Sequence, residues 1–486
     1  MKENIVLIDR GLRLFDSVYK SEKINIKYLI VDYDAQVEEI QKTHNIENIF
    51  AATDSLNEQI ACAVSHLNYD LVDEFKATQI KSEHFHARFS DDTNLIQYYY
   101  LCALSFWNEV FSLGDVSAVV LDGVEHGANY DNLILDVAKF HGVAGYTIEG
   151  FAGRPVTTSL RNELLVSYPS VSSFAVMNYK TREYVAIDCQ QLGLNLTNLS
   201  NYLFYLDKAN SDQEGKPKSI FKKTTAILSS FKKRIPYGNF MALKHMVFNK
   251  TLSFYNVGAP VSQLLGNMKY AKKLEKFYNS IAVEFDTSKK CVFYALHFEP
   301  ETSIMVRTRL RNQLMIIKLL SQSLPKDWVL YVKEHPDQFR LNKPGFWFFL
   351  ITIHKFRTKE FYQEISKFDN VQLLNFSSKS REIIQKSEAV ASINGTIALE
   401  AISFNKPLVL VGHESTPVGL CKDVLKVTSA KQYREALEKV GAGFTPEYVD
   451  FKEIVDNYAF ESSNFSSFDA RLLIEYLVCE YSYSQK

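Results

Sequence analysis

The chain has 486 residues, of which 46% are hydrophobic and 13% aromatic. This length allows two or three domains, and the apolar content excludes a mainly disordered protein. The 55 basic and 56 acidic residues nearly cancel, so the overall charge favours no particular partner and gives no reason to expect nucleic-acid binding. The six scattered cysteines form no CxxC pair, which predicts free thiols in a reducing compartment.

The first half of the chain alternates strand-like and helical patterns. Apolar β-branched runs at Ile5–Ile8, Tyr28–Val31 and Ala118–Leu121 predict buried strands, and the periodicity of Leu95–Val110 predicts a helix. This alternation favours a parallel sheet with helices on both faces.

Charged residues follow two of these predicted strands. Arg10 and Arg13 come after the first, and Asp122, Glu125 and His126 come after Ala118–Leu121. The carboxyl ends of parallel strands are where open α/β sheets bind ligands. Asp122 could equally cap the following turn, and the two arginines could be ordinary surface residues.

A basic segment lies between the two halves. Gly215–Leu274 contains twelve lysines and arginines and no Asp or Glu, with aromatic residues interleaved. The segment could be a solvated helical face, or it could contact an anionic membrane surface or a polyanionic substrate. The sequence leaves these two readings open.

The second half repeats the alternating pattern more clearly. Strands are predicted at Cys291–Leu296, Trp328–Lys333, Val371–Leu374, Ala389–Ile393 and Leu408–Val411. The amphipathic run after the first of these, residues 304–320, predicts a helix that follows the strand's turn directly.

Unusual polar residues gather after the carboxyl ends of these strands. They are His297, Glu299, Glu301, Lys333, His335, Asn394, Gly395 and Thr396, with Glu400 one helical turn further along. A glycine turn before a helix suits phosphate, because the backbone can approach closely and the helix presents free N–H groups. Thr396 could instead merely cap the helix, with Glu400 facing solvent.

Several of these stretches also resemble a known family. The series "YALHFEPETS", "YVKEHP", "NGTIALEA" and "KPLVLVG" is similar to the capsule polysaccharide biosynthesis glycosyltransferases, which include Kdo transferases. A weaker similarity lies in "DGVEHGANYDNLILDVAKFHGV". The resemblance implies an α/β protein of GT-B architecture, in which two Rossmann-like domains face each other across a cleft. The expected organisation is an acceptor-side domain at 1–210, a basic helical linker at 211–285, a nucleotide-sugar domain at 286–425 and C-terminal helices at 426–486 that cross back.

The resemblance also implies roles for individual residues. His335 and the Gly395–Thr396 turn would contact the donor phosphate, Glu400 the nucleotide sugar, and His297 with Glu299 or Glu301 would line the donor pocket. Lys333 and Asn394 belong to the same donor-binding set. Glycosyl transfer needs a base or a carboxylate nucleophile, for which Glu125 is the first choice, His126 the second and Asp122 a further candidate. Arg10 and Arg13 could bind an anionic acceptor or donor carboxylate.

The resulting hypothesis is a metal-independent glycosyltransferase without a cofactor. It would move a sugar, in one version a CMP-activated acidic sugar, to a surface or capsular polysaccharide or a lipid-linked glycan. The alternatives are a teichoic-acid-type polyol-phosphate transferase and a nucleotide-sugar 2-epimerase. No apolar stretch approaches the roughly 20 residues that span a bilayer, so we expect a cytoplasmic protein. Association with the inner face of the cell membrane stays open.

Overall fold

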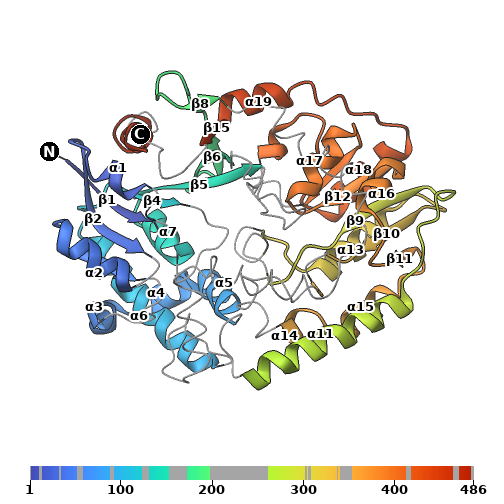
Figure 1. The fold of residues 1–486 in the computed structure, drawn as a ribbon, viewed down its shortest axis with the longest axis horizontal. Coiled ribbons are helices and arrows are strands. Elements are labelled where there is room, and N and C mark those ends of the chain that lie inside the picture. The colour runs from blue at the N-terminus through green and yellow to red at the C-terminus, as the bar shows by residue number, and fades with distance from the viewer. Residues whose placement is uncertain are drawn as a thin grey trace, which may run out of the picture. The chain divides into compact units, whose positions relative to one another are not determined.

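The chain folds into two compact units, shown in the computed structural model of Figure 1. Unit 1 comprises Met1–His86, Ser90–Val261 and Tyr458–Lys486, and unit 2 comprises Ser262–Asn457 together with Ala87–Phe89. The structure describes all residues except 1, 10–11, 13, 32–33, 52–57, 88–91, 123–130, 153–171, 197–260, 301–303, 305–307, 336–337, 340–352, 412–416, 463–469 and 483–486.

Unit 1 is built on a nine-stranded sheet whose first five strands are parallel. Their order is β3-β2-β1-β4-β5, with bounds β1 Glu3–Ile8, β2 Ile24–Val31, β3 Asn48–Ala51, β4 Ala118–Asp122 and β5 Ala144–Ala152. The sheet continues through antiparallel pairings with β6 Ser172–Asn178, β7 Glu183–Val185, β8 Asn195–Leu196 and β15 Ala459–Ser462. The parallel part has the strand order of a Rossmann fold, and the direction of winding reverses between β1 and β4.

Helices connect the strands of unit 1. They are α1 Phe15–Val18, α2 Asp34–Thr43, α3 Glu58–Cys62, η1 Ala63–His66, α4 Tyr69–Glu74, α5 Lys76–His86, α6 Thr93–Ser112, α7 Asp131–Phe140, α20 Arg471–Glu475 and η6 Tyr476–Tyr481. Helix α6 begins after Asp92, whose side chain accepts a hydrogen bond from the Leu95 N–H at 2.9 Å. This cap satisfies one of the unpaired donors at the helix start.

The C-terminal segment of the chain packs into unit 1. Strand β15 pairs with β6, and the side chains of Leu473 and Leu477 are buried in the core of this sheet. Ser21 donates a hydrogen bond of 2.6 Å to the nearly buried Glu475. Residues 426–457, by contrast, group with unit 2.

Unit 2 contains a six-stranded sheet in which every pairing is parallel. Its order is β11-β10-β9-β12-β13-β14, with bounds β9 Cys291–Ala295, β10 Val329–Lys333, β11 Val371–Leu373, β12 Ala389–Ser392, β13 Leu408–Val411 and β14 Leu425–Val427. Counted within the unit, this is the 3-2-1-4-5-6 order of the doubly wound Rossmann fold. The direction of winding reverses between β9 and β12.

Helices connect the strands of this sheet and pack against it. They are α11 Val261–Ile281, α13 Gln313–Ser323, α14 Ile353–Phe356, α15 Lys359–Ile365, α16 Ser380–Lys386, α17 Thr396–Ser403, η4 Pro417–Leu420, α18 Ala430–Gly441 and α19 Phe451–Tyr458. Apolar side chains of α11, α13, α15 and α18 share one core with alternate residues of the strands. Helix α11 therefore packs into unit 2, within the range that the sequence assigns to a separate linker.

The two parallel-sheet, Rossmann-like units confirm the predicted α/β class. One predicted helix was partly wrong, because residues 308–312 are not helical and α13 begins only at Gln313. The Asn312 side chain accepts a hydrogen bond from the Met315 N–H at 2.9 Å. Asn312 itself has extended backbone angles, so it caps the helix rather than continuing it.

Candidate nucleotide-binding site

The candidate site lies at the carboxyl edge of the unit 2 sheet, where the strand order reverses. His297 follows β9, and Asn394 and Gly395 follow the neighbouring strand β12. In open α/β sheets the loops on either side of this point separate and leave room for a ligand. The structure thus brings together two stretches that lie 96 residues apart in the sequence, counted from His297 to Ile393.

The turn between β12 and α17 requires a glycine. Gly395 has φ of +88° and ψ of −179°, a combination that is essentially confined to glycine. A Cβ added at Gly395 would lie 3.6 Å from His297 Cε1 and 4.0 Å from His297 Nδ1. Gly395 is also the N-cap of α17. It has no side chain that could cap the helix, so the backbone N–H groups at the start of α17 receive no side-chain hydrogen bond from it.

His297 is a buried, neutral histidine that supports this turn. Its Nε2 accepts a hydrogen bond from the Ile393 N–H at 3.3 Å, which assigns the ring proton to Nδ1. Ser392 Oγ lies 3.4 Å from the same nitrogen and donates to the Asn394 carbonyl at 2.7 Å. Burial, with smaller effects of His335 and Arg357, lowers the pKa of His297 to about 3. The imidazole therefore carries no charge at neutral pH.

The backbone of His297 is held by two further side chains. Gln313, the first residue of α13, accepts from the His297 N–H at 2.8 Å and donates to the His297 carbonyl at 3.2 Å. Arg357 donates to the same carbonyl through Nη2 at 2.9 Å. These contacts fix the position at which the loop leaves β9.

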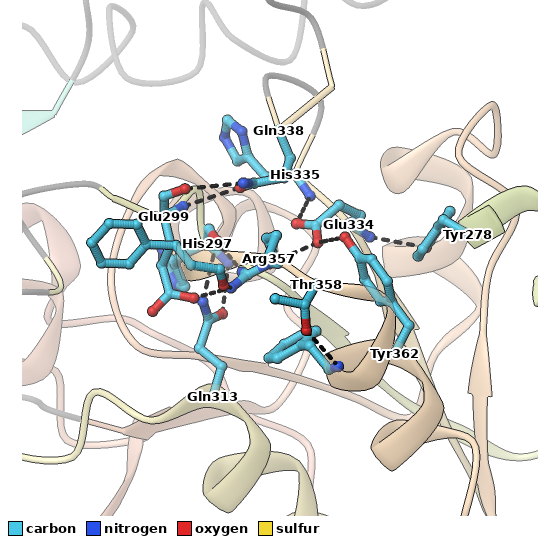
Figure 2. A network of polar contacts seen from close by, with 12 residues as sticks. Tyr278, His297, Glu299, Gln313, Glu334, His335, Gln338, Arg357, Thr358 and Tyr362 are labelled. Carbon is cyan, nitrogen blue, oxygen red and sulfur yellow. Dashed lines mark hydrogen bonds and ion pairs between the residues drawn. The ribbon is translucent and has the colours of Figure 1, made fainter. Parts of the chain in front are cut away.

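Arg357 is the centre of a buried polar network, which we call the Arg357 network: Arg357, His297, Glu299, Glu334 and Tyr362. Figure 2 shows Arg357 between Glu299 and Glu334. Its Nε donates to Glu334 Oε2 at 2.9 Å, and its Nη1 forms an ion pair with Glu299 Oε2. The Arg357 side chain is fully buried, and these carboxylates compensate its charge.

The Glu334 carboxylate makes contacts on both of its oxygens. Tyr362 donates to Oε2 at 2.6 Å, while Oε1 accepts from the His335 N–H at 2.7 Å. The Glu334 N–H donates to the Tyr278 hydroxyl at 3.1 Å, which in turn donates to the Leu374 carbonyl. Burial alone would lower the pKa of Arg357, but Glu334 and Glu299 hold it above its ordinary value. Arg357 is therefore permanently charged.

The other candidate residues of unit 2 surround this network. His335 is half-buried, with its ring 5.9 Å from that of Phe298. Lys333 is 5% exposed, and its Nζ lies 5.8 Å from the Phe376 ring. The half-buried Glu400 lies on α17, where burial raises its pKa and Arg381 opposes that effect. Glu301 and the side chain of Thr396 lie outside the described residues.

The corresponding edge of unit 1 is described only in part. Asp9, directly after β1, accepts hydrogen bonds from the N–H groups of Leu14 and Phe15, both at 2.7 Å. Asp122 ends β4 and is 4% exposed. The other predicted residues of this edge lie outside the described part of the chain: Arg10, Arg13, Glu125 and His126.

Arg357, Gln313, Gln338 and Tyr362 were not among the residues selected from the sequence. The Gln338 side chain binds the backbone of Glu299. It donates to the Glu299 carbonyl at 2.9 Å and accepts from the Glu299 N–H at 3.1 Å. Nothing in the local pattern around Arg357 distinguishes it from a surface arginine. Glu299 and Glu334 follow two predicted strands, but the sequence does not show which basic residue pairs with them.

Within the described ranges, no group of three or more His, Cys, Asp or Glu side chains is arranged to hold a metal ion. No helix in the described part of the chain combines the length and apolar composition needed to cross a membrane.

Comparisons with known proteins concern the fold. No family model matches the chain, and no curated protein sequence matches it. Among solved structures, UDP-GlcNAc 2-epimerase from Methanocaldococcus jannaschii is similar, with 12% identity, 98% of this chain and 99% of that chain covered, and a TM-score of 0.24. KpsC, the β-Kdo 2,7 transferase of Thermosulfurimonas dismutans, has 13% identity, coverage of 68% and 79%, and a TM-score of 0.28.

A third structure, UDP-GlcNAc 2-epimerase from Neisseria meningitidis bound to UDP-GlcNAc, has 12% identity, full coverage of both chains and a TM-score of 0.22. Two Rossmann-like units in one chain are the components of the GT-B architecture that the sequence predicts.

Proposed function

We propose that this chain is a nucleotide-sugar-using enzyme and that unit 2 binds the nucleotide at the carboxyl edge of its sheet. The observation that carries the proposal is the Gly395 turn. This turn has a backbone conformation that is essentially confined to glycine, and it lies directly before helix α17, where the strand order reverses. It also lies against the buried His297. Backbone N–H groups at such a helix start bind phosphate, aided by the helix dipole.

Within that class we favour a glycosyltransferase of surface or capsular polysaccharide assembly. The sequence motifs after β9, β10 and β12 support this choice. The diphosphate or monophosphate of the donor would lie on the Gly395–Thr396 turn with His335 beside it. Glu400 would bind the nucleotide sugar, with His297, Glu299 and Glu301 around the donor.

Unit 1 would supply the groups that act on the acceptor. Glu125, or His126 in its place, would take the proton from the acceptor hydroxyl, because glycosyl transfer needs a base or a nucleophile. Arg10 and Arg13 would bind an anionic group of the acceptor or donor. These roles come from the sequence motifs and require tests by substitution.

A thermal-shift screen with CMP, CDP, UDP and GDP tests the nucleotide-binding proposal. A ligand that binds only the native state increases the free energy of unfolding by mass action, by about 2.7 kcal/mol when its concentration is 100 times its dissociation constant. The melting temperature rises accordingly. We expect stabilisation by at least one nucleotide, and none by the four would overturn the proposal. Product analysis then separates the reactions, because a 2-epimerase converts UDP-GlcNAc without an acceptor, and a polyol-phosphate transferase leaves phosphate on its product.

Replacing His335 by Ala should weaken nucleotide binding while the fold stays intact. His335 is half-buried, and the hydrogen bond that it gives to Glu334 comes from its backbone N–H, which the substitution keeps. Loss of a charge-assisted contact to phosphate costs about 1.5–3 kcal/mol, or roughly 10- to 100-fold in affinity. Calorimetry of the best nucleotide measures this effect. An affinity equal to that of the wild type would remove His335 from the site.

The exposed face of α11 contains the described end of the predicted basic segment. Lys269, Lys272 and Lys273 of this segment are exposed, and so is Lys276, which follows it on the same helix. Leu274 on the opposite face is 1% exposed. At about 1 kcal/mol for each lysine near an anionic membrane, these four should give measurable binding. We expect the change of these four lysines to Gln to lower the affinity for phosphatidylserine vesicles at low salt at least about tenfold. Sedimentation of the protein with the vesicles measures this affinity.

A matched control removes the same charge elsewhere on unit 2. Lys367, Lys379, Lys431 and Lys452 are exposed and each lies within ion-pair distance of a carboxylate. Their change to Gln should leave vesicle binding close to that of the wild type. Equal losses in the two quadruple variants would show that only net charge matters, and the α11 face would have no special role.

A further inference from the structure

The Arg357 network links three loops at the carboxyl edge of the unit 2 sheet. We propose that Arg357 is a positioning residue for nucleotide binding, which sets the loops after β9, β10 and β12 in the arrangement that receives phosphate. This inference rests on the proposed function, and one of its tests is independent of nucleotide binding.

The links form a continuous chain from one loop to the next. Arg357 binds Glu334 after β10, and it binds both the carbonyl of His297 and the carboxylate of Glu299 after β9. His297 Nε2 then accepts from the Ile393 N–H, at the end of β12. Because Gly395 follows two residues later, the phosphate-binding turn is connected to Arg357 through a single histidine.

Two features of Arg357 fit positioning better than plain charge compensation. Its Nε, Nη1 and Nη2 each donate to a different group, and these groups belong to two separate loops. The planar guanidinium fixes the angles among these donors, whereas a lysine ammonium would offer one flexible point of contact. Arg357 itself precedes α15, so it joins a third segment of unit 2 to both loops.

The network also determines which hydrogen-bonding groups the site offers. Glu334, held by Arg357, accepts from the backbone N–H of His335 and so positions the residue proposed to contact phosphate. With Nε2 of His297 occupied by Ile393, the remaining ring donor is Nδ1–H, close to the Gly395 turn. Loss of Arg357 should therefore misplace two donors of the site at once.

The first test measures UDP and CMP affinities by calorimetry for the wild type, Arg357→Lys and Arg357→Ala. We expect both variants to bind about 10- to 100-fold more weakly, because small misplacements of binding groups have effects of this size. Millimolar guanidinium should restore much of the affinity of Arg357→Ala. Arg357→Lys keeps the charge, so it serves as the folded comparison if the alanine variant is too unstable.

Tyr448→Phe is the matched control for loss of stability. The Tyr448 hydroxyl bonds the Lys406 carbonyl and the Leu408 N–H at the amino edge of β13, away from the candidate site. This variant should lose stability but keep its nucleotide affinity. Equal affinities of wild type and Arg357→Lys, or an equal loss in Tyr448→Phe, would overturn the inference.

The second test follows the His297 ring by NMR with histidine-selective ¹⁵N labelling, assigned through His297→Gln. The wild type should show one protonated nitrogen, Nδ1, and one unprotonated nitrogen, Nε2. Arg357→Lys should show exchange between the two tautomers. An unchanged tautomer in that variant would contradict the positioning role even if no nucleotide binds, whereas failure of the wild type to bind any nucleotide would overturn the proposed function alone.

Discussion

Replacing Arg357 by Met should lower the free energy of unfolding by about 3–5 kcal/mol, the largest effect expected in this protein. The substitution leaves Glu334 buried without its cationic partner, and its side chain is fully inaccessible. It also removes the ion pair to Glu299, whose side chain is 15% exposed. Urea denaturation followed by circular dichroism measures the change.

A second substitution distinguishes loss of charge compensation from loss of packing. Glu334→Gln removes the uncompensated charge, so the Arg357→Met, Glu334→Gln double variant should be more stable than Arg357→Met alone. The double-mutant cycle gives the coupling energy of the pair. If Arg357→Met costs less than about 1 kcal/mol, the buried ion pairs do not hold these loops.

Lowering the pH from 7 to 5 should destabilise the wild type by about 2 kcal/mol more than a His297→Gln variant. The pKa of His297 is about 3 in the folded state, because the imidazole is buried, against 6.5 for an exposed histidine. Between these values the unfolded state takes up a proton and the folded state does not. The stability due to neutral His297 is therefore complete above pH 6.5 and is lost progressively as the pH falls towards 3.

The variant comparison isolates this effect from the carboxylates, which also titrate in acid. Urea denaturation at pH 5, 6 and 7 gives the stability difference for each protein. A variant of the exposed His354 of α14, His354→Gln, is the matched control for replacing a histidine by glutamine. Parallel curves for His297→Gln and the wild type would show that folding does not lower the pKa of His297, and would contradict its burial as a neutral imidazole.

The strands of the sheet were predictable from the sequence. Buried parallel strands are continuous apolar runs, so Cys291–Ala295 and Leu408–Val411 stand out against the helices that flank them. Because parallel strands end at one edge, the polar residues after them were expected to converge. The structure brings His297 and Gly395 together there.

Long-range partners were not predictable in this way. Arg357 lies 58 residues from Glu299 and 23 from Glu334 in the sequence, and it belongs to no periodic pattern. The sequence therefore predicted Glu299 as a donor-binding residue without its buried partner. A helical period also does not reveal where a helix begins, which is why the cap at Asn312 was missed.

The antiparallel extension of the unit 1 sheet was also missed. In this extension Phe460 of β15 pairs with Phe174 of β6, although Ser262–Asn457 of unit 2 lies between these two strands in the sequence. Pairings between distant segments depend on the whole fold, and short strands carry little periodic signal. The resemblance led us to expect C-terminal helices at 426–486 that cross back, but no periodic pattern indicated that β15 in this range is a strand paired with β6.

Hydrogen–deuterium exchange with a saturating nucleotide tests the central claim most directly, because it reports both binding and its location. The nucleotide is the one that gives the largest thermal shift. We predict slower exchange at amides 393–398 and in the loops after β9 and β10, with the strongest protection at the Gly395 turn. Protection confined to unit 1, or no protection with any of the four nucleotides, would contradict a nucleotide site at the carboxyl edge of the unit 2 sheet.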